Sequence, residues 1–140
     1  MSTAVDTNVI IGLVAGSQDT VNATKSILER EGNVGALIIS PPVYAECLAH
    51  PGWNQSDLDR FLQRSRIRID WSLSQAVWIE AGLRFAAYNG PRRRLTGSGS
   101  PGRRLLTDFI IGAHALALGT LITFDSFFKS QFPDLRIVDR

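Results

Sequence analysis

The sequence predicts an α/β fold: a three-layer α/β/α domain with a central parallel sheet. Short apolar runs alternate with longer amphipathic stretches along the chain, the order typical of strands joined by helices. The runs are apolar almost throughout, as expected of strands that helices cover on both faces. The 140 residues are 44% hydrophobic and 20% charged, which is enough to build one core. We therefore expect residues 1–140 to form a single domain.

The predicted elements follow from apolar periodicity and from residues that begin or end helices. Strands are expected at residues 4–5, 34–39, 66–69, 121–124 and 135–138. Helices are expected at residues 9–14, 17–32, 41–50, 56–62, 74–88, 107–118 and 127–131. Ser17 or Asp19, the pair Pro41-Pro42, and Ser56 mark three of the helix starts. Residues 89–104, rich in Gly, Pro, Ser and Arg, are predicted to form a loop.

Composition excludes several classes of protein. The single cysteine, Cys47, rules out a disulfide framework and a zinc site built from cysteines. The longest uncharged stretch, residues 109–124, falls short of the roughly 18 residues that a membrane span needs. No signal peptide is recognisable in Met1-Ser2-Thr3, so we expect a cytoplasmic protein that does not enter a membrane.

Four carboxylates, which we call the site acids, occupy positions that favour the binding of a ligand or a metal ion. Asp6 and Asp125 each follow a predicted strand, and parallel sheets bind ligands at the carboxyl ends of their strands. Glu46 and Asp108 lie among apolar residues of predicted helices, where an ionised carboxylate is unfavourable unless a positive charge meets it. Four carboxylates at one rim would repel one another, and a divalent cation removes that conflict. Oxygen ligands alone favour Mg²⁺ or Mn²⁺ over zinc.

Helix capping gives a second explanation for three of these acids. Asp6, Asp108 and Asp125 each stand near a predicted helix start, where aspartate commonly caps the helix. Glu46 is different, because a residue in the middle of a helix caps nothing. Asp70 also ends a strand, and Glu80 lies within a helix, so acids outside the site are expected too.

Four segments resemble, in order, the motifs of the PIN domain, the nuclease domain of VapC-type toxins. These segments are residues 4–10 (AVDTNVI), 40–46 (SPPVYAE), 107–115 (TDFIIGAHA) and 121–128 (LITFDSFF). The resemblance spans nearly the whole chain and implies a PIN-like domain whose site acids, Asp6, Glu46, Asp108 and Asp125, bind the Mg²⁺ (or Mn²⁺) used for RNA hydrolysis. It also implies that Thr123 places its hydroxyl near the site and that Asn8 orders the loop around Asp6.

The function implied by this resemblance is that of a metal-dependent endoribonuclease. The family further implies a cytoplasmic toxin, neutralised by a cognate antitoxin and commonly a homodimer. Two alternatives stay open: a PIN-like RNA-binding or scaffold module without catalysis, and an RNA-processing PIN nuclease outside a toxin pair. A haloacid-dehalogenase-type phosphatase is disfavoured, because it needs a second aspartate where Asn8 stands. A receiver domain is disfavoured because it needs paired acids after its first strand.

The distribution of positive charge gives a candidate RNA-binding segment. Of the 15 cations only Lys25 and Lys129 are lysines, and arginine makes two-pronged contacts to phosphate. Five arginines bracket the Gly/Ser-rich segment before Asp108: Arg92, Arg93, Arg94, Arg103 and Arg104. We expect them either to guide RNA phosphates toward the metal or to keep a solvated loop soluble.

Other reactive or aromatic residues have structural explanations. His114 is expected to pack or to make a hydrogen bond, since neither His50 nor His114 has partners for a catalytic triad. Cys47 is expected in the core, not as a nucleophile. The three tryptophans are expected in the core or at a subunit contact more than in stacking on RNA bases: Trp53, Trp71 and Trp78.

Overall fold

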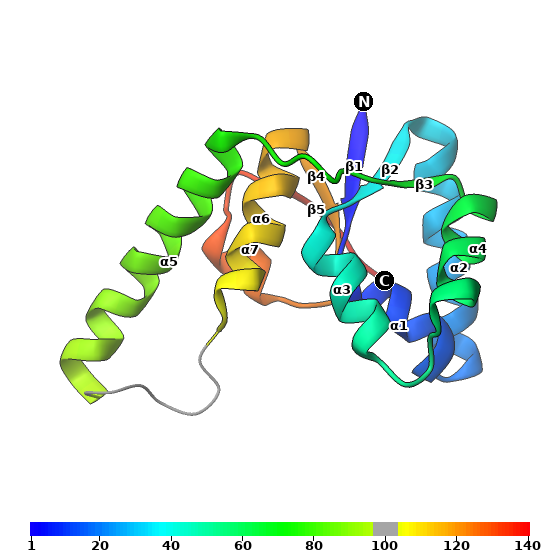
Figure 1. Cartoon of the computed structure of the whole chain (residues 1–140), viewed down its shortest axis with the longest axis horizontal. Coiled ribbons are helices and arrows are strands. Elements are labelled where there is room, and N and C mark those ends of the chain that lie inside the picture. Colours follow the sequence, from blue (N-terminus) through cyan, green and yellow to red (C-terminus); the bar gives the residue numbers. More distant parts are fainter. Residues whose placement is uncertain (97–103) are drawn as a thin grey trace.

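The computed structural model describes the backbone of residues 1–96 and 104–140, and the side chains of these residues outside 91–96. Five strands of this described chain form one parallel sheet in the order β3-β2-β1-β4-β5 (Figure 1). The strands are β1 (Ser2–Val5), β2 (Ala36–Ile39), β3 (Ile67–Ile69), β4 (Thr120–Ile122) and β5 (Arg136–Val138). The predicted α/β class with a central parallel sheet is therefore confirmed.

The strand order reverses at the middle of the sheet, between β1 and β4. From β1 the chain builds outward through β2 to β3, and then returns to add β4 and β5 on the other side of β1. This reversal separates the loops that follow β1 and β4, and leaves a crevice at their carboxyl ends. The register pairs Val5 with Ile122, so Asp6 and Thr123 emerge side by side.

The described helices are α1 (Thr7–Ala15), α2 (Gln18–Val34), α3 (Pro41–Ala49), α4 (Gln55–Arg64), α5 (Gln75–Thr96), α6 (Leu106–Leu118) and α7 (Phe127–Gln131). Apart from the end of α5, the helices begin and end within about two residues of the predicted positions, and α2 continues to Val34, the predicted first residue of a strand. Ser17 caps α2 by accepting a hydrogen bond from the Thr20 N–H. The α4 cap is Asn54 and not Ser56, because the Asn54 side chain accepts from the Asp57 N–H at 2.8 Å. Among the described residues, no helix combines the length and the apolar character that crossing a bilayer requires.

Helix α5 corrects the prediction of a loop over residues 89–104. The helix continues through Gly90 and Pro91 to Thr96, and residues 97–103 lie outside the described chain. A proline removes one backbone hydrogen bond but does not by itself end a helix when good helix formers follow. The sequence after Pro91 is Arg-Arg-Arg-Leu, which are such residues. In Figure 1, α5 and α6 run side by side, on the opposite side of the view from α4 and α2.

The core holds α6 firmly against the sheet. The side chain of Phe109 is fully buried, and its ring contacts those of Phe85, Phe127 and Phe132 at centroid distances of 5.3, 5.4 and 6.2 Å. A side chain at Gly112 would overlap the Phe132 ring, so only glycine lets α6 approach this closely. Packing of α6 fixes the position of the helix start, where Asp108 lies.

Candidate active site

Asp6 lies at the centre of the candidate site, between the central strand and the first helix. It caps α1, with its Oδ1 accepting from the Thr7 N–H at 2.7 Å. Its Oδ2 accepts from the Thr123 hydroxyl, which follows the neighbouring strand β4, also at 2.7 Å. The side chain is only 6% exposed. Asp6 therefore both caps α1 and belongs to the candidate site.

Glu46 reaches the same region from α3. Its Oε1 accepts a hydrogen bond of 2.6 Å from the hydroxyl of Thr7, the first residue of α1. Sequence reasoning missed Thr7, although it is the middle residue of the Asp-Thr-Asn segment. Its hydroxyl fixes Glu46 while its N–H holds Asp6, so one residue orients two of the site acids.

Asp108 and Asp125 complete the group, and each also binds a backbone N–H at a helix start. The Asp108 carboxylate accepts from the Leu105 N–H at 3.1 Å, and the Asp125 carboxylate from the Phe127 N–H at 3.0 Å. Asp125 additionally forms a two-pronged ion pair with Arg104, with N–O distances of 2.6 and 3.0 Å. Arg104 was grouped with the phosphate-binding candidates, and its pairing with a site acid was not foreseen.

Thr123 and Asn8 tie the two central loops together. The Thr123 hydroxyl donates to Asp6 and accepts from the Asp125 N–H at 3.1 Å. The Asn8 side-chain oxygen accepts from the Phe124 N–H at 3.3 Å. The start of α1 is thereby joined to the segment after β4, which keeps Asp6 and Asp125 on the same rim.

The four site acids border a single pocket of about 400 Å³. Burial raises the pKa of Asp6 to about 6, and the negative charges of Glu46 and Asp108 act in the same direction. Hydrogen bonds from Thr123 and Thr7 oppose the rise without cancelling it. Burial also raises the pKa of Asp108, with a further contribution from the charge of Asp125. The pocket is therefore an anionic site in which burial and neighbouring negative charges raise the pKa of Asp6 and of Asp108.

A hard divalent cation fits this donor set. The pocket offers carboxylate oxygens, the ligands that Mg²⁺ and Mn²⁺ prefer. No described Lys or Arg lies within ion-pair distance of Asp6, Glu46 or Asp108, so their charge is left without a fixed counter-ion. In the part of the chain that is described, no three such groups already stand in ligating positions.

The arginine cluster is described only in part. The side chains of Arg92, Arg93 and Arg94, and all of Arg103, lie outside the described residues. The backbone of residues 92–94 belongs to α5, not to a loop. Arg104 alone of the five has a described side chain, and it pairs with Asp125, which borders the pocket.

The acids expected outside the site do not line the pocket. Asp70 lies 3.3 Å from the Nε2 of His114, whose pKa is lowered by burial, and Glu80 pairs with Arg84 on α5 at 3.7 Å. Cys47 is fully buried, and burial raises the pKa of its thiol to about 12, which makes it a poor nucleophile.

The tryptophans differ from one another in exposure. Trp53 is half-buried against Phe61, with the ring centroids 5.4 Å apart. Trp71 and Trp78 are 63% and 51% exposed, so they do not lie in the core of this chain, and a place at a subunit contact stays a prediction. Trp71 rests edge-on against Tyr44, and Trp78 lies on the outer face of α5. Burial could not be read from these residues alone, because neighbouring elements decide which side of each segment is covered.

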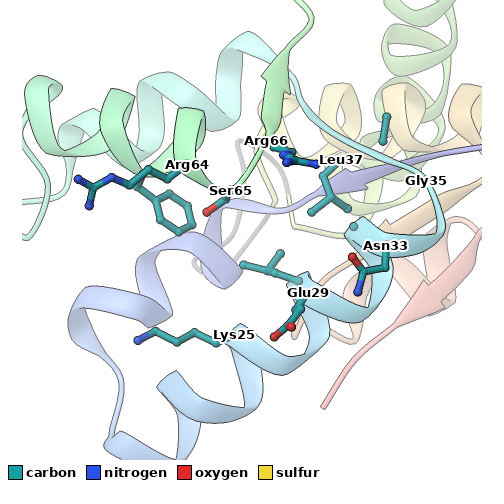
Figure 2. A pocket seen from close by; sticks show the side chains of 12 residues that line it. Lys25, Glu29, Asn33, Gly35, Leu37, Arg64, Ser65 and Arg66 are labelled. Atoms are coloured by element: carbon teal, nitrogen blue, oxygen red, sulfur yellow. The ribbon is translucent and has the colours of Figure 1, made fainter.

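A second hollow, of about 690 Å³, lies at the other end of the sheet (Figure 2). It is lined by residues that precede β2 and β3, with Lys25, Arg64 and Arg66 around it. Glu29 is the only acid among its described lining residues. Size alone would favour this hollow, but it lacks the converging carboxylates found at the carboxyl ends of β1 and β4.

Known structures share this architecture. A solved structure of VapBC2 from Rickettsia felis, bound to a DNA fragment from their promoter, contains a chain that is 21% identical to this one, with a TM-score of 0.62. The alignment covers 100% of this chain and 99% of that one. A chain in the structure of VapBC-1 from nontypeable Haemophilus influenzae is 24% identical, with a TM-score of 0.62 and coverage of 99% and 98%.

Family assignment rests on the sequence itself. No curated protein matches the chain. The PIN domain family matches over residues 3–131, which include all four site acids and the segments that carried the resemblance. With this match and the observed parallel fold, the chain belongs to the PIN domain family.

Proposed function

We propose that this protein is an endoribonuclease that hydrolyses RNA phosphodiester bonds with the help of Mg²⁺ or Mn²⁺. The observation that carries the proposal is the convergence of Asp6, Glu46, Asp108 and Asp125 on one pocket. These acids come from four separate parts of the chain, and helix capping does not explain Glu46. Membership of the PIN domain family supports the same conclusion.

Each residue of the site has a proposed role. Asp6 and Asp108 hold the cation, and Glu46 and Asp125 complete the negative charge that attracts it. A bound cation of this kind lowers the pKa of water and stabilises charge on a phosphoryl oxygen. Thr7 and Thr123 orient Glu46 and Asp6 through hydrogen bonds of 2.6 and 2.7 Å, so the carboxylates are held in place before substrate binds.

We further propose that the nuclease is the toxin of a toxin–antitoxin pair and acts in the cytoplasm, where its RNA substrate is. The support is the likeness to chains in two VapBC structures, at full length in each case. A cognate antitoxin would then be its protein partner. The competing assignments are an RNA-processing nuclease without an antitoxin, and an RNA-binding or scaffold module without catalysis.

A homodimer is proposed on the exposed face of α5. Trp78, Ile79 and Leu83 lie on this face and are 51%, 51% and 65% exposed. Gly82 and Ala86 are also exposed on α5 and leave room for a second helix to approach, and the charge of the nearby Glu80 is paired with Arg84. Monomeric proteins seldom expose an apolar patch of this kind. In light scattering coupled to gel filtration, Leu83→Glu should convert a dimer to a monomer, and a wild-type monomer would contradict the proposal.

The nuclease proposal is tested with purified protein and total RNA, with Mn²⁺ and with EDTA. Wild type should cleave RNA only with Mn²⁺, and Asp6→Asn should not cleave. Glu80→Gln is the matched control, because it removes an acid that does not border the pocket. RNA binding without cleavage under all conditions would favour the scaffold alternative. Cleavage of equal rate in EDTA would refute the role of a metal.

A further inference from the structure

Arg104 is the described basic residue that is bonded directly to a site acid. It stands two residues before α6, and its guanidinium donates to both oxygens of Asp125, at 2.6 and 3.0 Å. The same guanidinium lies over the ring of Phe127, 4.4 Å from the ring centroid. The guanidinium is therefore held both by the Asp125 carboxylate and by the Phe127 ring. These contacts link the segment before α6 to the segment after β4.

The geometry of this pair is stronger than that of an ordinary surface ion pair. The side chains of Arg104 and Asp125 are 33% and 24% exposed, and the contact is two-pronged. Bidentate arginine–carboxylate pairs are the stronger and more specific class of charged hydrogen bond.

The pair also takes up much of the acceptor capacity that Asp125 would offer to a metal ion. Asp125 Oδ2 accepts from Arg104, and Oδ1 accepts from both Arg104 and the Phe127 N–H. Both carboxylate oxygens are thus engaged within the protein. The other three site acids have no such basic partner among the described residues. Asp125 therefore binds a cation only in competition with Arg104, which holds both of its oxygens.

Phosphate offers Arg104 an equivalent partner. A phosphodiester group presents two oxygens with nearly the spacing of a carboxylate, and guanidinium binds both groups in the same two-pronged manner. RNA bound at the pocket would bring such a group within reach of a guanidinium that is already held there. A flexible chain of methylene groups allows the short movement from one partner to the other.

We propose that Arg104 is an exchangeable counter-ion of the active site, which holds Asp125 until the divalent cation and RNA bind and then passes to a phosphate oxygen of the RNA. This inference rests on the proposed function and adds a substrate-binding residue to it. Arg104 neutralises one acid of the empty pocket and limits repulsion among the four. When the cation and RNA are bound, Arg104 contacts the RNA phosphate and Asp125 contacts the cation.

The first test measures Mn²⁺ binding to RNA-free protein by isothermal titration calorimetry. Arg104→Gln should bind Mn²⁺ about three- to tenfold more tightly than wild type, because Asp125 is released from its partner. Arg140→Gln is the matched control, since Arg140 also lies over an aromatic ring, that of Phe124, but bonds no site acid. In an Asp125→Asn background the gain from Arg104→Gln should vanish.

The second test measures RNA binding in EDTA, by fluorescence anisotropy of a labelled RNA oligonucleotide. Asp125→Asn should tighten RNA binding by about three- to tenfold, because Arg104 is freed to bind phosphate. Asp108→Asn, which removes the same charge without freeing Arg104, should tighten it less. Adding Arg104→Gln to Asp125→Asn should remove the gain, whereas Arg104→Lys should keep part of it.

The outcomes distinguish a failure of the proposed metal-dependent function from a failure of the Arg104 exchange alone. If wild type and Asp6→Asn bind Mn²⁺ equally, or neither binds it, the proposed function fails and the exchange fails with it. If wild type binds Mn²⁺ and Arg104→Gln binds it no better, only the exchange is refuted. A gain in RNA binding by Asp125→Asn that survives Arg104→Gln refutes it as well. Circular dichroism of each variant establishes that the changes arise in a folded protein.

Discussion

Replacing Asp6 by asparagine should abolish RNA cleavage and yet stabilise the metal-free protein. Asparagine has the shape of aspartate, and its side-chain oxygen can still accept from the Thr7 N–H. Its amide group can donate to the Thr123 hydroxyl, which now bonds the carboxylate. The variant therefore keeps the packing and both contacts, but it loses the buried negative charge.

The size of the gain follows from the pKa of Asp6. Burial raises that pKa from 3.8 to about 6, so the folded state holds a proton that the unfolded state releases. At about 1.4 kcal/mol per pH unit, the ionised carboxylate lowers the free energy of unfolding by about 3 kcal/mol above pH 6. Below pH 4 the carboxyl is protonated in both states and the penalty disappears. The loss of stability thus develops as pH rises from about 4 to 6.

Urea unfolding in EDTA, followed by circular dichroism from pH 4 to pH 8, measures this effect. Asp6→Asn and wild type should have similar unfolding free energies near pH 4, and the variant should be more stable by up to about 3 kcal/mol at pH 8. Excess Mn²⁺ should then stabilise wild type alone, because ligand binding favours the folded state. A variant less stable than wild type at pH 8 would refute the claim that Asp6 is destabilised by burial.

Three further predictions concern residues around the site. Thr7→Val should reduce the rate of RNA cleavage about tenfold in a gel assay, because Glu46 loses its hydrogen bond of 2.6 Å, and Thr7→Ser should restore most of it; equal rates would contradict the orienting role. Gly112→Ala should lower the free energy of unfolding by about 2 kcal/mol or more, measured with urea, since its Cβ would overlap the Phe132 ring; an unchanged midpoint would show that the ring moves freely. Calorimetric Mn²⁺ affinity should fall about tenfold per pH unit below about pH 6, as Asp6 gains its proton; an affinity independent of pH would exclude Asp6 as a ligand.

Local sequence patterns were sufficient for the strands and for most helices. The run Ala36–Ile39 is short, apolar and half β-branched, and the segment that begins at Pro41 carries a helix start, so each element could be recognised by itself. Local signals failed where two of them compete, as at Gly90-Pro91, where the helix continues past a sequence that usually ends one. They also left open whether Trp71 lies in the core, because its exposure depends on which elements pack beside it.

The candidate site was predictable as a set of residues but not as an arrangement. Strand ends, apolar surroundings and the resemblance to PIN motifs singled out the four site acids, and the family match covers all of them. The hydrogen bond from Thr7 to Glu46 joins residues 39 positions apart, and the pair of Arg104 with Asp125 joins residues 21 apart. No local pattern carries such contacts, because they exist only once the helices have packed against the sheet.

Sequence alone determined the class of fold, the family and the identity of the acids, since periodicity and motif order are properties of neighbouring residues. Tertiary structure decided what surrounds those acids. The pairing of β1 with β4 places Asp6 between the two loops that follow these strands, and burial there raises its pKa to about 6. Tertiary structure also sets Arg104 against Asp125 and leaves the apolar face of α5 uncovered. Burial and charge pairing arise from elements distant in sequence meeting in space, which is why only the folded chain reveals them.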